Sequence, residues 1–187
     1  MSAMTISNWM AWEAGVDVAG STASGLALPN LILHVARVVH TPLGSAPAGL
    51  VLWQPNPQAA PVLAGFVCAD AKIGAYFGPR IFAGTPFEHA PVLTAKIEVR
   101  VDLPRSVASR IEVGGHVFEA RLSELGPSEL VQRGCGAPMP FAQQGVEASA
   151  ARVVVSVDGA PLTLSIPPIG LSGGPGAVWA PAGVYAR

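Results

Sequence analysis

The four histidines are the side chains of this sequence best suited to bind a metal or to transfer a proton near neutral pH. They are His34, His40, His89 and His116. His34 and His40 fall in one extended apolar run, where a rise of about 3.3 Å per residue separates them by about 20 Å. Glu88 beside His89 offers a second ligand in a loop, but no spacing points to a converging set. We therefore expect structural histidines, with no metal site and no cofactor.

Serine and cysteine nucleophiles need a neighbouring base and a supporting local structure. Neither is evident around the serines that stand beside glycine, which are Ser24, Ser45 and Ser172. Cys135 stands between two glycines near Arg133, a setting that can expose a thiol and lower its pKa, but an inert thiol in a tight turn explains the same residues. Cys68 and Cys135 match no metal spacing, and we expect free, buried thiols, with a disulfide as the alternative. We assign no catalytic residue, and the sequence leans away from an enzyme.

Charged residues are few, and most lie in the middle of the chain. They make up 12% of the 187 residues, against about 25% in an ordinary soluble domain, and the net charge is −1. Residues 1–69 carry three charges and residues 159–187 carry one. No cluster of lysine and arginine can neutralise phosphates, so we expect no direct binding to nucleic acid. Both flanks have the composition of segments that are covered in the folded protein.

Proline and glycine separate short apolar runs, which is typical of strands joined by tight turns. Residues 94–103 alternate apolar and charged side chains, as in a strand with one buried face. Residues 75–82 read as a further extended piece. A short helix is predicted over residues 128–133, capped by Ser128 and ended by Gly134. The predicted fold is all-β, an antiparallel sandwich or barrel of about 8–10 short strands with one short helix and extended arms.

Two hairpins are the most specific structural predictions. The first spans residues 110–122, where Gly114-Gly115 can adopt the positive φ angles of a two-residue turn and so set the register of both strands. The second spans residues 152–166 around Asp158-Gly159. Pro161 in its returning strand lacks an amide donor, which predicts an edge position in the sheet or a bulge.

The two ends of the chain are predicted to be arms around one central domain. The N-terminal arm covers residues 1–28, the β-sandwich or barrel covers residues 29–167, and the C-terminal arm covers residues 168–187. The arms carry four aromatic residues that favour burial, which are Trp9, Trp12, Trp179 and Tyr185. Arms that fold back over their own subunit and arms that dock on a neighbouring subunit both satisfy this pattern. We take these aromatic residues as candidate interface residues.

The sequence favours a structural or interaction subunit that assembles with copies of itself into a homo-oligomer or a larger particle, such as a virion or capsid. Its start lacks the basic region of a secretion signal, which predicts synthesis in the cytoplasm without a signal peptide. Prolines interrupt the long uncharged stretches, so no transmembrane segment is expected. A small-molecule-binding β-barrel or an enzyme with an apolar pocket is the first alternative. A membrane-active toxin component is the second.

Overall fold

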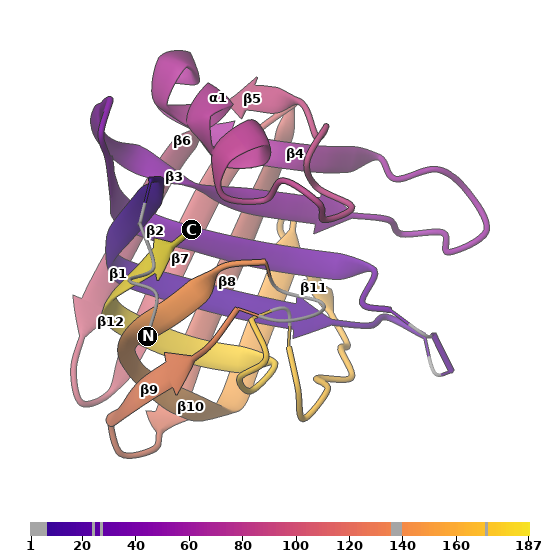
Figure 1. Ribbon diagram of the computed structural model, residues 1–187. Helices are drawn as coiled ribbons and strands as arrows, with labels where there is room; N and C mark the ends of the chain where they lie inside the picture. Colours follow the sequence, from indigo (N-terminus) through magenta and orange to yellow (C-terminus); the bar gives the residue numbers. More distant parts are fainter. Residues whose placement is uncertain (1–6, 24, 27, 136–139, 171) are drawn as a thin grey trace.

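The computed structural model describes residues 7–23, 25–26, 28–135, 140–170 and 172–187 (Figure 1). Its strands are β1 Trp9–Gly20, β2 Leu31–Thr41, β3 Gly44–Trp53, β4 Leu63–Cys68, β5 Val92–Thr94, β6 Lys96–Asp102, β7 Ser106–Val113, β8 His116–Leu125, β9 Glu129–Arg133, β10 Ala142–Val157, β11 Ala160–Leu162 and β12 Ala177–Ala186. Helix α1 spans Ala71–Arg80. The prediction of an all-β fold with one short helix is confirmed.

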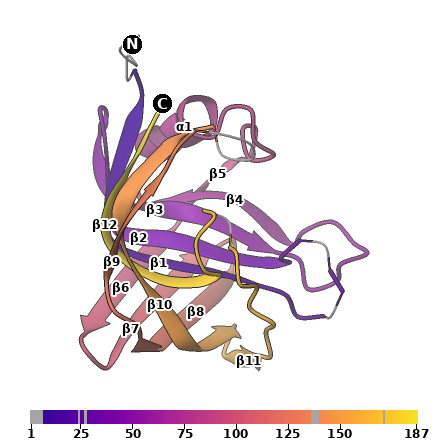
Figure 2. The same ribbon diagram turned by 60° about the horizontal axis from the view of Figure 1, so that its bottom comes forward.

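All of the strands belong to one curled sheet (Figure 2). Its order is β5-β4-β3-β2-β1-β12-β10-β8-β7-β6, and β9 and β11 pair with β10 beside this path. Strands that neighbour each other are antiparallel, except that β4 and β5 are parallel. This exception arises because α1 and the loop after it return the chain to the same end of the sheet before β5 begins. The curl brings β6 against β1, β2 and β3, so a single sheet forms two layers.

Two hydrophobic cores lie on opposite faces of the central strands. The inner core fills the space between the two layers, and its fully buried members include Leu33, Ile111 and Phe118. The outer core lies between the sheet and α1, where Phe66 contacts Phe77 of the helix with ring centroids 5.8 Å apart. Since β1, β2 and β3 contribute to both cores, they are apolar on both faces and show little of the alternation of a half-exposed strand.

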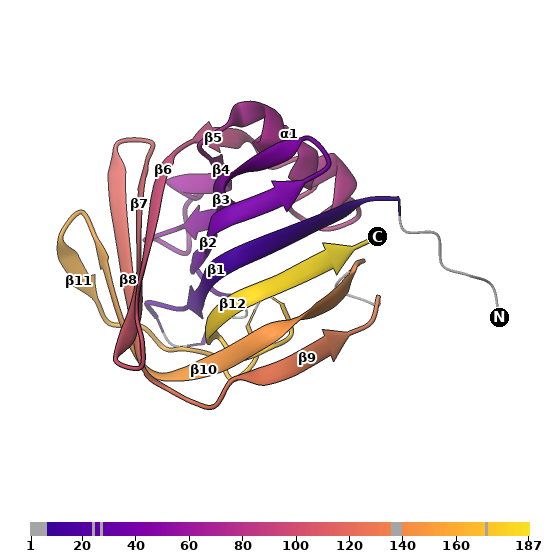
Figure 3. The same ribbon diagram turned by 90° about the vertical axis from the view of Figure 1, so that its left-hand side faces the viewer.

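The terminal segments differ from the predicted arms, because they form two adjacent strands at the centre of the sheet. β1 pairs with β12 from Trp9 opposite Ala186 to Val18 opposite Ala177 (Figure 3). The apolar side chains of β1 and β12 are thus covered within this subunit. Each of the two strands has sheet partners on both sides and apolar neighbours on both faces. Residues 1–6 of the predicted N-terminal arm lie outside the described residues.

The short helix lies elsewhere than predicted. Residues 129–133 form β9, which pairs with β10, because five residues lose too much entropy to nucleate a stable helix and gain main-chain bonds by adding to a sheet. The helix instead covers most of the segment expected to be extended at 75–82. Asp70 caps it by accepting hydrogen bonds from the amides of Lys72 and Ile73. No helix within the described ranges has the length and apolar character required to cross a membrane.

Both predicted hairpins form, although the returning strand of the second ends at Leu162 and is shorter than predicted. β7 and β8 pair with Val113 opposite His116, the register that a two-residue turn at Gly114-Gly115 requires. On the exposed face of this hairpin, Arg110 Nη1 lies 2.7 Å from Glu119 Oε1. β10 and β11 pair around Asp158-Gly159, and β11 stays at an edge with β10 as its partner, as expected for a strand that contains proline.

Candidate functional site

A backbone irregularity in the middle of β1 creates the most polar region of the interior. Ala14 has a φ of 55°, in the left-handed region that alanine rarely adopts. Regular alternation would place Trp12 and Ala14 on one face, but Trp12 packs in the outer core and Ala14 packs in the inner core. The strand therefore rotates at Ala14. As a result, Asp17 lines the same cavity as Trp12.

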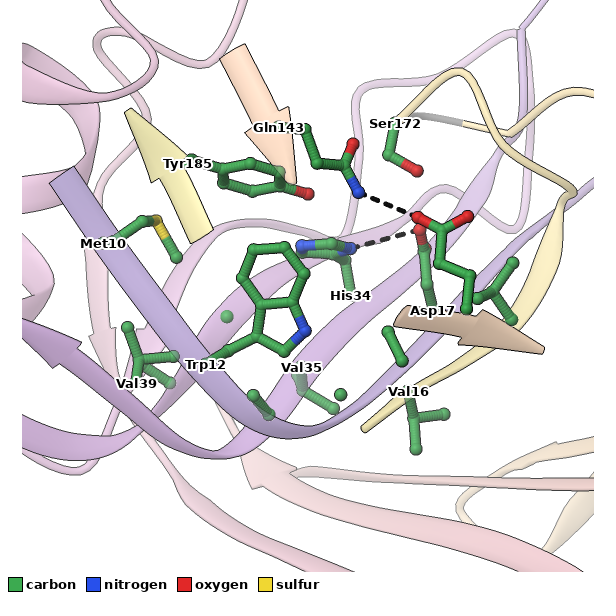
Figure 4. Close-up of a pocket in the computed structure, with 17 residues that line it drawn as sticks. Met10, Trp12, Val16, Asp17, His34, Val35, Val39, Gln143, Ser172 and Tyr185 are labelled. Atoms are coloured by element: carbon green, nitrogen blue, oxygen red, sulfur yellow. Dashed lines mark hydrogen bonds and ion pairs between the residues drawn. The ribbon is translucent and has the colours of Figure 1, made fainter. Parts of the chain in front are cut away.

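Asp17 and His34 form a buried ion pair across β1 and β2. They stand directly opposite each other in the sheet, and His34 Nδ1 lies 3.2 Å from Asp17 Oδ2 (Figure 4). Burial lowers the pKa of His34, but the Asp17 carboxylate and the more distant Glu147 charge outweigh it, so the pKa lies above its usual value of 6.5. The ring of Tyr185 stacks over His34 at 6.3 Å between centroids. Burial raises the pKa of the Tyr185 phenol, which stays neutral.

A second buried ion pair joins β9 to β10 beside the first. Arg133 donates from Nη1 to Glu147 Oε1 at 2.6 Å and from Nη2 to Glu147 Oε2 at 2.7 Å. Gln143 Nε2 donates to the same Glu147 Oε1 at 2.8 Å. Only 7% of Glu147 is exposed, so the two-pronged contact with arginine is its charge compensation. These three residues with Asp17 and His34 are called the buried polar cluster.

The buried polar cluster encloses little free space. The cluster and Trp12 line the same cavity. Its volume is about 30 Å³, which is enough for one or two water molecules. Within the described residues, Asp17 Oδ1 and Gln143 Oε1 are buried without a hydrogen-bond partner and face this space. The arrangement can hold water and charge inside the sheet.

The buried polar cluster makes stability depend on pH. His34 has a higher pKa in the folded chain than in the unfolded one, so its contribution is complete below about pH 6.5 and is lost as pH rises through the folded-state pKa. We expect the free energy of unfolding to fall over this range in the wild type and to fall less in His34→Gln. Urea unfolding at closely spaced pH values measures both slopes. Equal slopes in the two proteins would contradict this account.

A groove with no charged residue opens between the loop before β2, the loop after α1 and the loop before β12. Its lining includes Leu28, Ile32, Phe82, Phe87 and Ile169, and it offers about 440 Å³. Leu28 and Ile169 are 78% and 68% exposed at its rim. This volume falls in the range of small-molecule sites, and its lining favours an apolar occupant. We call it the apolar groove.

The sheet ends at β6, whose outer edge has no strand partner among the described residues. Ile97 and Val99 point into the inner core, while Lys96, Glu98 and Arg100 alternate with them on the outer face. Lys96 Nζ lies 3.0 Å from Glu98 Oε1, and Arg100 Nη2 lies 3.4 Å from Glu98 Oε2. These exposed pairs hold the side chains along the strand and leave the main-chain edge open.

Three of the candidate histidines pair with acidic residues. Besides His34, His116 Nδ1 lies 2.7 Å from Asp158 Oδ2, and His40 Nε2 lies 3.0 Å from Glu13 Oε1. His89 is exposed in the loop after α1. Within the described residues, no three His, Cys, Asp or Glu side chains converge in a way that could hold a metal ion.

Ser45, one of the candidate serines, joins His40 and Glu13 in a hydrogen-bonded series across β3, β2 and β1. Ser45 Oγ lies 2.7 Å from His40 Nδ1, on the opposite side of the ring from Glu13. Serine hydrolases use such a series, with the serine on Nε2 and the acid on Nδ1, inside a cleft that supplies donors to an oxyanion. Here the two ring nitrogens have exchanged roles, and the three residues line neither the buried cavity nor the apolar groove. The series is an exposed contact between strands.

The remaining candidate residues lie apart from one another. Cys68 and Cys135 are free thiols, as expected, but Cys135 is exposed, which corrects the prediction that both are buried. Burial raises the pKa of the Cys68 thiol. Ser172 is buried at the rim of the cavity with Asp17, and Ser24 lies outside the described residues.

The four candidate interface residues separate into one exposed and three buried side chains. Trp12, Trp179 and Tyr185 are 7%, 5% and 2% exposed and pack in the cores of their own subunit. They are therefore unavailable at the surface, because β1 and β12 are central strands. Trp9 is 37% exposed, and its place at an interface stays a prediction.

Sequence reasoning missed the buried polar cluster, although one signal for it was present. Asp17 and His34 are single polar residues within apolar strands, and a buried charge requires a partner. Arg133, Gln143 and Glu147 gave no such signal, since polar, small and apolar residues are mixed around them in the sequence.

Comparisons of the chain with protein-family models, with curated proteins and with solved structures find no match.

Proposed function

We propose that this protein is a structural or interaction subunit that assembles with copies of itself into a homo-oligomer or a larger particle such as a virion. The observation that carries this proposal is the seven-residue edge strand β6, which has no outer partner among the described residues. Main-chain amides and carbonyls along an open edge are a template for a strand of another chain. The composition agrees, because a chain with 12% charged residues has little charge to keep copies apart.

Exposed apolar side chains at the end of the same strand also support assembly. Val101 in β6 is 39% exposed, and Leu103 in the turn after β6 is 54% exposed. Water contact with such side chains is unfavourable, and a second subunit would remove it. Assembly in this form needs no terminal arm, since β1 and β12 already pair with each other inside the subunit.

A second candidate function is binding of a small apolar molecule in the apolar groove. The observation that favours it is a volume of about 440 Å³ with no charged lining residue. Thr85 in the lining already donates its hydroxyl to the Phe82 carbonyl at 2.7 Å. The groove therefore favours a hydrocarbon or aromatic group over a polar ligand.

Sedimentation velocity over a wide concentration range tests assembly. The wild-type chain is expected to sediment as a dimer or larger species at micromolar concentration, because the open edge and the exposed apolar residues are satisfied only between copies. A neutral fluorescent probe, N-phenyl-1-naphthylamine, is titrated in parallel. A chain that stays monomeric at every concentration would contradict assembly, and a monomer that binds the probe with loss of binding in Leu28→Asp would support the second function.

A further inference from the structure

We propose that β6 pairs with β6 of a second copy of this chain, antiparallel and centred on Val99, to join two sheets into one. This inference rests on the proposed function and names the surface that would carry it. The sequence of β6, Lys-Ile-Glu-Val-Arg-Val-Asp over Lys96–Asp102, indicates that the partner strand is a second β6. The resulting dimer has two-fold symmetry, in which the same surface of each copy contacts the other.

The charges of β6 are complementary to their own reversed order. In an antiparallel pair centred on Val99, Lys96 stands opposite Asp102 of the second copy and Glu98 stands opposite Arg100. By symmetry, each of these contacts occurs twice. Opposite charges that face each other across two strands stabilise the pair, and like charges destabilise it.

The apolar residues of β6 are also matched with one another in the register centred on Val99. Within β6, Val99 meets its own copy and Val101 meets Ile97 of the second chain. Leu103 lies in the turn that follows β6, beside this contact. Val101 and Leu103 are the exposed apolar residues at this end of the sheet, while Ile97 and Ala95 are 7% and 6% exposed and extend the inner core. The pairing therefore covers Val101, an exposed apolar side chain of β6 itself.

Neighbouring registers of the same pair are unfavourable. A pair centred on Glu98 sets Glu98 against itself and Lys96 against Arg100. A pair centred on Arg100 sets Arg100 against itself and Glu98 against Asp102. A shift by a single residue in the pairing sets apolar side chains opposite charged ones. Registers centred on Ile97 or Val101 also set opposite charges against each other, but they pair only part of Lys96–Asp102. The register centred on Val99 is complementary over the full strand.

The geometry of the fold leaves room for a partner at this position. β6, β7 and β8 stand together at one side of the layer formed by β1 to β4, and β6 is the last strand of that group (Figure 3). Arg100, Val101 and Asp102 are all exposed, because this end of β6 runs past the strands that it crosses. A second copy can therefore approach the edge without displacing any described strand.

Charge reversal at one position, followed by exchange of both positions, tests the register. Glu98→Lys places lysine opposite Arg100 of the second copy, and Arg100→Glu places glutamate opposite Glu98. Each single variant is expected to raise the dimer dissociation constant at least about tenfold. The double variant Glu98→Arg with Arg100→Glu restores opposite charges at both contacts and is expected to recover most of the affinity. Sedimentation equilibrium measures the three constants against the wild type.

Glu119→Lys is the matched control. Glu119 is also an exposed glutamate with an arginine partner, but it lies on β8, which has strands on both sides. The dimer dissociation constant of the Glu119→Lys variant is expected to equal that of the wild type. Circular dichroism verifies that each variant keeps its β structure. An oligomeric wild type whose affinity is unchanged by Glu98→Lys and Arg100→Glu, or reduced equally by Glu119→Lys, would overturn the β6 pairing alone. A monomeric wild type would overturn the proposed function with it.

Discussion

Replacing Gly183 with alanine is expected to lower the free energy of unfolding by about 3 kcal/mol. Gly183 lies on β12 opposite Trp12 on β1, and the indole ring of Trp12 occupies the space where a side chain at position 183 would begin. A Cβ at this position would overlap the ring atoms Cζ2 and Cη2 of Trp12. The ring cannot move aside easily, because Tyr185 packs against it with centroids 4.8 Å apart. Urea unfolding followed by tryptophan fluorescence measures the loss.

Gly134→Ala is the control for the loss of a glycine. A Cβ at Gly134 would have no described atom within 4 Å, and its φ is not in the left-handed region. This variant is expected to stay within about 0.5 kcal/mol of the wild type. Similar unfolding midpoints for Gly183→Ala and Gly134→Ala would show that the ring of Trp12 does not pack against Gly183.

Removing the arginine of the buried polar cluster is expected to have an effect of similar size. Arg133→Met leaves the Glu147 carboxylate, which is 7% exposed, without its two-pronged partner. An uncompensated buried charge costs about 3 kcal/mol or more. Methionine keeps much of the length of the arginine side chain. The decrease in the free energy of unfolding therefore comes mainly from the lost charge and less from lost packing. Chemical denaturation near neutral pH provides the measurement.

Two further variants isolate the role of charge in that result. Adding Glu147→Gln to Arg133→Met removes the unpaired carboxylate and is expected to recover part of the stability. Arg105→Met removes an arginine from an exposed pair with Asp102, at 2.7 Å, and is expected to leave the unfolding midpoint nearly unchanged. The explanation fails if Arg133→Met is no more destabilising than Arg105→Met.

The hairpins could be predicted from the sequence because local chemistry decides them. In β7 and β8, the glycine pair sets the turn, the alternation sets the buried face, and Arg110 and Glu119 agree with the resulting register. The same reasoning was correct for β10 and β11, where Pro161 requires an edge. These features involve residues that are close along the chain, so each residue's own preference is enough to find them.

Local preference was insufficient where a segment had two acceptable structures. Residues 129–133 can begin a helix, but the neighbouring β10 offers them a full set of main-chain bonds. The segment of α1 contains three glycines or prolines within Ala71–Arg80, which argues against a helix. Its Asp70 cap and the burial of Ile73 and Phe77 in the outer core outweigh that preference. Tertiary contacts, which the sequence does not display, decide both cases.

The sparse charge of the two ends and the alternating charge of the middle were determined by the sequence alone. Which surfaces these residues occupy was decided only by the tertiary structure. It placed the apolar ends in the centre of the sheet and brought Asp17, His34 and Glu147 together from three strands. It also placed β6 at the end of the sheet, where its charge order faces outward along an open edge. The physical reason is that strand neighbours are chosen by pairing between distant segments, and the pattern within one strand defines its faces but not its partners.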